Sequence, residues 1–296
     1  MKKDFPRKEF QALASPVLDT DFFNQADEIY TEDFLHYATT AEENDDFYDS
    51  QLGYEDIMTA VEELVGAQPT LLIPKELAHL LEYVYNVAID NKDAERINNY
   101  GTLFYTGQIG NQDFAMAEKF YKMAASLGCA KSIENLGYIY YYGRTGEVDY
   151  EKAFRQFAEC AILYNRPISI YKLGDLYKNG YYVEKNEQTA FLLYRRANDI
   201  VQKNSLPNDD DCTGDVCFRL GDCFHRGIGT EPCLDLALDF FQKAEVAFID
   251  RLRQGDFLIK KMLTTAIDRQ EEIRRLIAAD LPDMEWAKKN TGYNTL

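Results

Sequence analysis

Leu136-Gly137-Tyr138-Ile139-Tyr140-Tyr141-Tyr142-Gly143 is the clearest copy of a pattern that the chain repeats. In each copy an apolar residue precedes an anchor glycine, an aromatic residue follows three positions later, and a second glycine closes the pattern six positions after the anchor. The anchors, spaced by 36, 37 and 47 residues, are Gly101, Gly137, Gly174 and Gly221, and the closing glycines are Gly107, Gly143, Gly180 and Gly227. Such regular recurrence predicts a repeat architecture.

The second half of each copy carries a small residue sixteen positions after the anchor and an aromatic four positions further on. These residues are Ala117, Ala153, Ala190 and Ala237, followed by Tyr121, Phe157, Tyr194 and Phe241. Residues spaced by three, four and seven share one helix face, so each copy predicts two helices. A helical glycine costs about 1 kcal/mol relative to alanine, and its recurrence predicts a close helix contact that a Cβ would block. The closing glycine is expected to end the first helix in the left-handed conformation, and Asp113, Asp149 and Asn186 to cap the second helices.

These motifs resemble the Sel-one-like repeat, a relative of the tetratricopeptide repeat. The resemblance rests on residues 136–143 and on Gly146-Glu147-Val148-Asp149-Tyr150-Glu151-Lys152-Ala153, and it covers about half of the chain, from Ala94 to about Phe248. It implies an all-α fold: a right-handed α-α superhelical solenoid of repeated helix pairs with helical caps. It also implies a protein-interaction scaffold without catalytic residues or cofactors. The departures are Pro167 and Gly214 at the opening of the third and fourth repeats, and the long third spacing.

Three domains are expected along the chain. Residues 1–92 form an acidic N-terminal helical region that includes a cap and a degenerate repeat, residues 93–250 form the four repeats, and residues 251–296 form a C-terminal capping helix and tail. Helical spacing of apolar residues predicts the capping helices at 74–90 and 256–279, with less regular helical patterns at 21–37 and 54–65.

The chain has a formal net charge of −18, and the acidity is concentrated near its start. From Glu9 to Pro74 there are 16 acidic residues and no Lys or Arg, whereas the remainder is nearly neutral. Nucleic-acid binding is disfavoured because it requires a clustered basic surface. The acidic stretch is either a solvated helical face or a surface for a basic partner. No apolar run is long enough for a membrane span and the first residues lack a secretory signal, so a cytoplasmic location is expected.

Catalytic and metal sites find little support in the sequence. The histidines His36, His79 and His225 form no zinc motif. Cys212, Cys217, Cys223 and Cys233 lack metal-ligand spacing, and all six cysteines are expected to be free thiols. Asp209, Asp211, Thr213 and Gly214 match only half of a calcium loop, since Leu220 stands where a glutamate is needed. We therefore expect a non-enzymatic protein without cofactors.

A partner is expected to bind along one stripe of the first helices, which in a stacked array lines the inner, concave surface. Unlike the core positions, this stripe changes from repeat to repeat, and its members are Asn99, Thr102, Asn135, Tyr138, Tyr142, Lys172, Asp175, Arg219, Asp222 and Arg226. Tyr138, Tyr142 and Arg226 are the best candidate anchors, because Tyr and Arg dominate interface energies. The stripe could equally be an ordinary exposed polar surface. The main functional hypothesis is a scaffold or adaptor that binds a peptide or protein segment, and the alternative is an inhibitor or immunity-type protein that neutralises a basic partner through residues 9–74.

Overall fold

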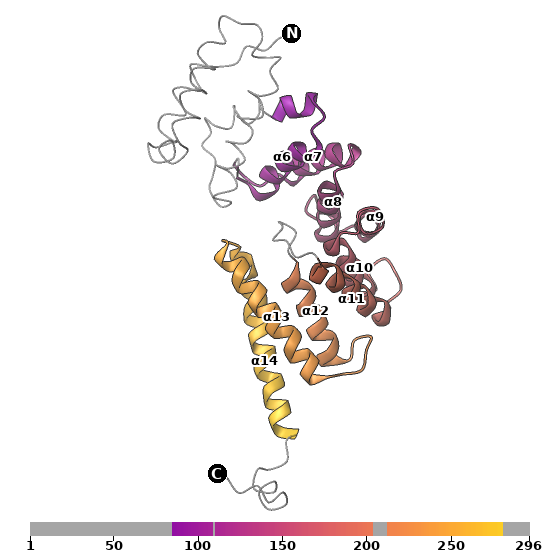
Figure 1. Ribbon diagram of the computed structural model, residues 1–296. Coiled ribbons are helices and arrows are strands. Elements are labelled where there is room, and N and C mark those ends of the chain that lie inside the picture. Colours follow the sequence, from indigo (N-terminus) through magenta and orange to yellow (C-terminus); the bar gives the residue numbers. More distant parts are fainter. Residues whose placement is uncertain (1–84, 109, 204–211, 281–296) are drawn as a thin grey trace, which may run out of the picture. The chain divides into compact units, whose positions relative to one another are not determined.

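The computed structural model describes residues 85–108, 110–203 and 212–280, whose regular secondary structure is entirely helical (Figure 1). Residues 85–90 are helical, and the elements that follow are α6 (Ala94–Thr106), α7 (Phe114–Ser126), α8 (Ala130–Tyr142), α9 (Tyr150–Leu163), α10 (Pro167–Asn179), α11 (Glu187–Lys203), α12 (Thr213–Arg226), α13 (Leu234–Arg253), the 3-10 helix η2 (Phe257–Ile259) and α14 (Lys260–Asp280). The prediction of an all-α chain of helix pairs is confirmed. The patterns at 21–37 and 54–65 and most of 74–90 lie outside the described residues.

The chain divides into two compact units, residues 1–132 (unit 1) and 133–296 (unit 2), with the boundary inside α8. In unit 1, α6 packs on α7. In unit 2, α10 packs on α11 and α12 on α13 in the same way, and α9 packs on α10 of the following repeat. Unit 2 is thus a stack in which one core joins α9, α10, α11 and α12, and a second core joins α12 and α13 to the C-terminal helices.

The ends of the first helices follow the sequence pattern. Gly107, Gly143, Gly180 and Gly227 all have positive φ angles, between 61° and 78°. In every repeat a backbone hydrogen bond joins the start of the second helix to the end of the first. The donor is the N–H twelve positions after the anchor glycine, and the acceptor is the carbonyl of the aromatic residue three positions after that glycine, as from Asp113 to Phe104 at 3.0 Å. The N-cap side chains of Asp113, Asp149 and Asn186 accept from the backbone N–H three residues further on at 2.9 Å. The loop between the two helices therefore starts with a left-handed glycine and ends with the same backbone hydrogen bond in all four repeats.

The anchor glycines lie against the aromatic ring of the second helix in the same repeat. A Cβ added at Gly101, Gly137, Gly174 or Gly221 would stand 2.9, 2.6, 2.5 or 2.9 Å from the nearest atom of Tyr121, Phe157, Tyr194 or Phe241. These distances are shorter than real side-chain contacts allow, so the predicted close approach is confirmed. The four rings, and the alanines one turn before them, are almost completely buried. Each repeat is held together by a ring that fills the space a side chain on the first helix would need.

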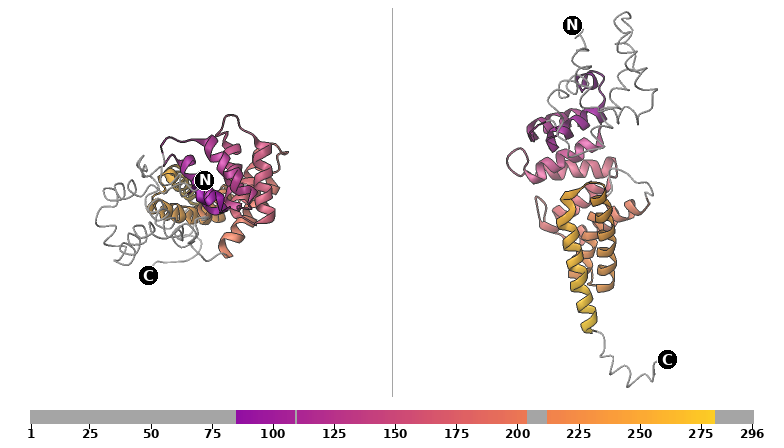
Figure 2. Two further views of the ribbon diagram at one scale, coloured as in Figure 1. Left: turned by 90° about the horizontal axis from the view of Figure 1, so that it is seen from above. Right: turned by 90° about the vertical axis from the view of Figure 1, so that its left-hand side faces the viewer.

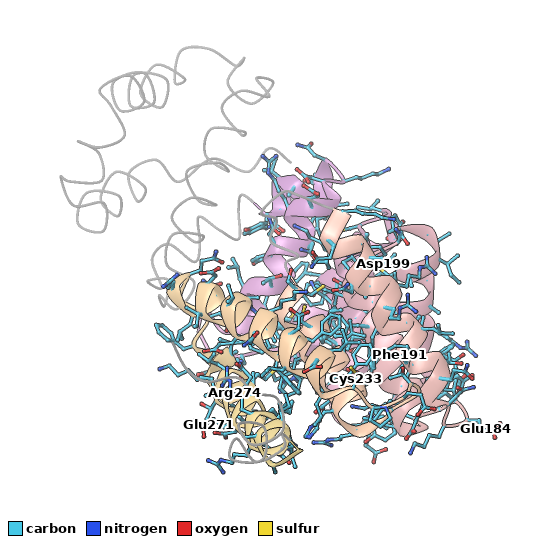
Figure 3. The ribbon with its side chains drawn as sticks, turned by 60° about the horizontal axis from the view of Figure 1, so that its bottom comes forward. Glu184, Phe191, Asp199, Cys233, Glu271 and Arg274 are labelled. Carbon is cyan, nitrogen blue, oxygen red and sulfur yellow. The ribbon has the colours of Figure 1, made fainter. Side chains whose placement is uncertain are left out.

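The C-terminal helix of unit 2 differs from the sequence prediction at its start. The helix expected from Asp256 instead starts as η2, where Leu258 is 94% exposed, and continues as α14. The helix α14 lies beside α13 in Figure 1 and in the right-hand view of Figure 2. Ile259 of η2 and Ala266 and Ile273 of α14 form a core with Phe241 and Phe248. The face of α14 turned to α13 thus buries apolar side chains together with Gln270, whose amide donates to Glu245, while Glu271 and Arg274 are exposed (Figure 3).

Candidate partner-binding site

The candidate stripe of unit 2 lies on the three first helices of that unit. Its members are Asn135, Tyr138 and Tyr142 on α8, Lys172 and Asp175 on α10, and Arg219, Asp222 and Arg226 on α12. Tyr142 and the Arg226 side chain are 46% and 47% exposed, whereas Lys172 and Asp175 are 4% and 6% exposed. The expectation that every member of the stripe lies on the accessible concave surface is therefore wrong at Lys172 and Asp175. Their positions are covered because side chains of the neighbouring first helices reach across them.

Asp175 is the most completely paired member of the stripe. Arg219 of α12 donates to both of its carboxylate oxygens, from Nε and from Nη2, each at 2.7 Å, and the Tyr194 hydroxyl donates to Oδ1 at 2.8 Å. Burial alone would raise the pKa of Asp175, but the Arg219 charge and its hydrogen bonds, with Lys172, hold that pKa below its ordinary value. Asp175 is therefore a carboxylate that joins the first helix of the third repeat to that of the fourth.

The ion pairing continues from Asp175 in both directions. Lys172 Nζ lies 3.9 Å from Asp175 Oδ2, and Arg219 Nη1 lies 3.7 Å from Asp215 Oδ1. Arg251 of α13 then bridges two carboxylates, with contacts of 2.6 Å to each. The result is a row of alternating charges, which we call the charge chain, and its members in order are Lys172, Asp175, Arg219, Asp215, Arg251 and Asp256.

Lys172, at one end of the charge chain, is enclosed by aromatic rings. Its Nζ lies between 4.9 and 5.6 Å from the centroids of four rings, which we call the tyrosine cage: Tyr138, Tyr141, Tyr142 and Tyr171. The ammonium also donates to the Tyr142 hydroxyl at 3.0 Å. Burial raises the pKa of Tyr138 and Tyr171 well above the ordinary value, so these phenols stay neutral. Four ring faces and one hydroxyl thus replace much of the water that a buried ammonium loses.

Tyr142 is both exposed and held in place. Its ring stacks on Tyr138, with centroids 6.0 Å apart and planes 9° from parallel, and meets the edge of Tyr141 at 5.0 Å. The guanidinium of Arg144 lies 5.3 Å from its centroid. An exposed ring that is fixed in this way loses little conformational freedom when a partner covers it. By contrast, Tyr138 is only partly exposed, and its hydroxyl lies 3.2 Å from that of Tyr171.

In two repeats, the stripe residue that follows the anchor glycine contacts the tyrosine hydroxyl of the second helix. In unit 1, Thr102 Oγ1 lies 3.1 Å from the Tyr121 hydroxyl, and the equivalent contact in the third repeat is Asp175 with Tyr194. The fourth repeat has Phe241 instead of a tyrosine. Among the described residues, Oδ1 of its stripe residue Asp222 is buried without a hydrogen bond, although the Arg226 guanidinium lies 3.7 Å away. Asn99, the other stripe residue of unit 1, is exposed.

Buried polar pairs between consecutive first helices were not found from the sequence. Ser132 donates to Asn98 at 2.8 Å in unit 1, and Ser169 donates to Glu134 at 2.6 Å in unit 2. Glu134 is only 4% exposed and also accepts from Arg166 at 3.0 Å. The sequence feature that indicates these pairs is a polar residue three positions before the anchor glycine, on the helix face that otherwise buries apolar side chains.

The cysteines and His225 form no reactive arrangement in the part of the chain that the structure describes. None of the six cysteines, all of which the structure describes, forms a disulfide, and five of them are buried. Burial raises the pKa of Cys160 to about 11 and that of Cys223 to about 12, which suppresses the reactive thiolate. No group of His, Cys, Asp and Glu in the described residues is placed to hold a metal ion. Phe191, which the sequence did not single out, packs edge-on against Phe224, while Glu184 and Asp199 lie at the surface (Figure 3).

The fold and the recurring glycine–aromatic contact define an α-solenoid built from helix-pair repeats. The chain is a Sel1-repeat protein: the Sel1 repeat model matches residues 97–129, 130–155, 167–199 and 214–245. The third and fourth segments begin at Pro167 and Gly214, where the sequence pattern placed the openings of those repeats.

Solved structures support the same fold. A Sel1 repeat protein from Oxalobacter formigenes matches with a TM-score of 0.53 and 20% identity, over 81% of this chain and 93% of that one. The protein c5321, a protective antigen of uropathogenic Escherichia coli with an SLR fold, matches with a TM-score of 0.54 and 20% identity, over 90% of this chain and 52% of that one. A search of curated protein sequences gave no significant match. At this identity the likeness concerns the fold alone.

Sel1 repeat proteins are in general scaffolds for protein–protein interaction. None of the described helices is both long and apolar enough to cross a lipid bilayer.

Proposed function

We propose that the protein is a non-enzymatic, cytoplasmic scaffold whose unit 2 binds a peptide or protein segment along the first-helix stripe. The observation that carries this proposal is Tyr142, a large amphipathic side chain that is nearly half exposed and yet held by stacking and by two cations. Tyrosines of this kind are typical interface anchors. Arg226, exposed at the other end of the stripe, is a second candidate contact.

The charge chain indicates that charge neutralisation contributes little to binding at this interface. Most charged groups of the stripe already pair with one another, so a partner has few of them left to neutralise. Binding at the stripe should then depend mainly on aromatic burial and hydrogen bonds, with a modest dependence on ionic strength. Nucleic acid is not an expected partner, since the stripe offers no cluster of unpaired basic groups.

The test compares two exposed tyrosines. Tagged protein is used to recover partners from its source cells, and the partner that binds stoichiometrically is then titrated against purified variants. Tyr142→Ala should weaken binding about thirtyfold, which corresponds to about 2 kcal/mol at an interface anchor. Tyr182→Ala, which alters a 53% exposed tyrosine outside the stripe, is the matched control and should bind as the unaltered protein does. Equal affinity of the two variants would remove the proposal.

Tyr138→Ala is not a suitable variant for this comparison. Its ring packs edge-on against the buried Phe157 at 5.7 Å and forms one wall of the tyrosine cage. Its removal would open a cavity, so a loss of binding would not be separable from a loss of folding.

A second candidate function follows from the charge distribution of residues 9–74. With 16 acidic and no basic side chains, this stretch could neutralise a basic partner. Replacing Glu42, Glu43, Asp45, Asp46 and Asp49 by the corresponding amides should then reduce both the affinity and its dependence on salt, while Tyr142→Ala should have no effect. The two variants thus separate the two functions.

A further inference from the structure

The turn that joins α13 to α14 presents two adjacent apolar side chains to solvent (Figure 1). Leu258 is 94% exposed, more than any other large apolar side chain of the described residues, and Phe257 beside it is 56% exposed. A single exposed leucine is ordinary on a protein surface. An exposed apolar pair with a polar rim is a candidate interaction surface.

The turn is held in one conformation around this pair. Ile259, the last residue of η2, is 4% exposed and lies in the core shared by α13 and α14. The Asp256 carboxylate accepts from the backbone N–H of Leu258 at 3.1 Å and from the Arg251 guanidinium at 2.6 Å. The exposed pair is therefore presented by a fixed turn and loses little conformational freedom when it is covered.

Two lysines follow the exposed pair directly. Lys260 and Lys261 are both exposed and lie in the first turn of α14, where the helix dipole disfavours cations. Lys260 Nζ lies 4.9 Å from the centroid of the Phe257 ring, so one positive charge stands at the edge of the apolar pair. Two locally unfavourable choices thus coincide in one turn, and such coincidences are expected at functional sites.

The carboxylates around the turn already have cationic partners. Asp250 pairs with Arg253 at 3.0 Å, and Asp256 pairs with Arg251 at the end of the charge chain. In the part of the chain that the structure describes, neither lysine of the turn forms an ion pair, so the turn carries an excess of positive charge. Exposed charges further away than about 8 Å are largely screened at physiological salt, so this local excess outweighs the net charge of the whole chain.

Two features favour a lipid surface over an acidic protein as the partner of this turn. A side chain that is 94% exposed has no neighbouring wall with which to form a pocket, whereas a bilayer interface accepts a protruding apolar group. The unpaired cations are lysines, point charges that suit phosphates, while the arginines, whose forks fit carboxylates, are already paired.

We propose that the α13–α14 turn docks the protein on an anionic lipid surface. Phe257 and Leu258 enter the boundary between headgroups and acyl chains, and Lys260 and Lys261 contact the lipid phosphates. Contact at this depth involves two side chains and needs no helix that spans the bilayer. The proposal goes beyond the proposed function, because it concerns where the scaffold is held and not which segment it binds.

Vesicle flotation of the full-length protein tests the proposal. Vesicles of phosphatidylcholine with about 30% phosphatidylserine carry the negative surface potential that attracts lysines, and they should bind the protein. Vesicles of phosphatidylcholine alone should bind it at least tenfold more weakly. High salt should also weaken binding to the anionic vesicles, because it shortens the screening length to about 3 Å at 1 M.

Two variants assign binding to the named side chains. Leu258→Asp should lower the partition coefficient at least tenfold, since it removes the larger apolar contact. Lys260→Gln combined with Lys261→Gln should lower it about tenfold or more, since each basic residue near an anionic surface contributes about fivefold. All three side chains are exposed, so both variants should keep the circular dichroism spectrum of the unaltered protein.

Matched controls change the same residue types outside the turn. Ile162→Asp alters an apolar side chain that is 77% exposed, and Lys185→Gln combined with Lys243→Gln removes two exposed charges. Both control variants should bind the anionic vesicles as the unaltered protein does.

Four results would overturn the proposal. Three of them are no binding to the anionic vesicles, equal binding to both kinds of vesicle, and full binding by Leu258→Asp. The fourth is a change of oligomeric state in Leu258→Asp, measured by light scattering, because a second copy of the chain would then cover the turn. Each of these results is separate from the effect of Tyr142→Ala on partner binding, so the proposed function would stand.

Discussion

Replacement of Gly174 by alanine tests the contact on which every repeat depends. The new Cβ would lie 2.5 Å from Cε1 and 2.9 Å from Cδ1 of Tyr194, so the ring must move. Overpacking of this kind costs about 1 to 3 kcal/mol. Displacement of the ring also threatens the 2.8 Å hydrogen bond from Tyr194 to Asp175, which as a bond to a charged group is worth about 1.5 to 3 kcal/mol. Against these costs, alanine stabilises the helix by about 1 kcal/mol relative to glycine, because its helix propensity is higher. The expected net destabilisation is about 1.5 to 5 kcal/mol, measured by urea unfolding followed by circular dichroism.

The same substitution in a second background shows whether the ring is the cause. In Tyr194→Leu the side chain is shorter, and the hydrogen bond to Asp175 is already absent. There Gly174→Ala should cost much less, and should become stabilising by up to about 1 kcal/mol if the clash disappears completely. A neutral or stabilising effect in the unaltered protein would refute the reasoning. So would an equal cost in both backgrounds, since the penalty would then not arise from the ring.

Further predictions concern the fourth repeat, the buried carboxylate and the thiols. Phe241→Tyr would bring a hydroxyl to the buried Oδ1 of Asp222, as in the third repeat, and should stabilise the protein by about 1 kcal/mol in the same unfolding assay; a loss of stability would contradict this equivalence. Asp175 has a folded-state pKa below its unfolded value, so its contribution to the free energy of unfolding is present above about pH 4 and is lost as pH falls through the lowered folded pKa. The variant Asp175→Asn should be about 3 to 5 kcal/mol less stable at pH 7, and its stability should fall less steeply with acid than that of the unaltered protein. Cys160 and Cys223, with pKa values raised by burial, should react with iodoacetamide at pH 8 at least tenfold more slowly in the folded protein than in urea, and equal rates would show that their burial is transient.

Sequence reasoning was strongest where one chemical requirement recurs in every repeat. The closing glycines, the N-caps Asp113, Asp149 and Asn186, and the ring opposite each anchor glycine all lie where the spacing placed them. Each of these features is local to one helix pair, so the offset along the chain is sufficient to find it. The start of α14 was missed because apolar spacing through Leu258 imitates a helix, whereas the Asp256 side chain caps a 3-10 turn there.

The candidate site was predictable only in part, because its members are brought together from different repeats. The sequence identified Tyr142 and Arg219 as variable positions, but the pairing of Arg219 with Asp175 joins residues 44 positions apart. Nothing local indicates that Lys172 is buried, because a lysine at that offset is equally suited to solvent. Helix periodicity gives the face on which a side chain lies, while the neighbouring helix decides whether that face is covered.

The polar pairs between first helices make the repeats of this chain non-interchangeable. Ser132 matches Asn98 and Ser169 matches Glu134, but the fourth repeat has Val216 at the serine position, following a repeat with Tyr171. If the fourth repeat were grafted directly after the first, Asn98 would meet a valine and its buried amide would lose its partner, at a cost of about 1 to 3 kcal/mol. Shuffled versions of this protein should therefore fold less well than the natural order, so that the sequence specifies which repeat follows which as well as the shape of each one.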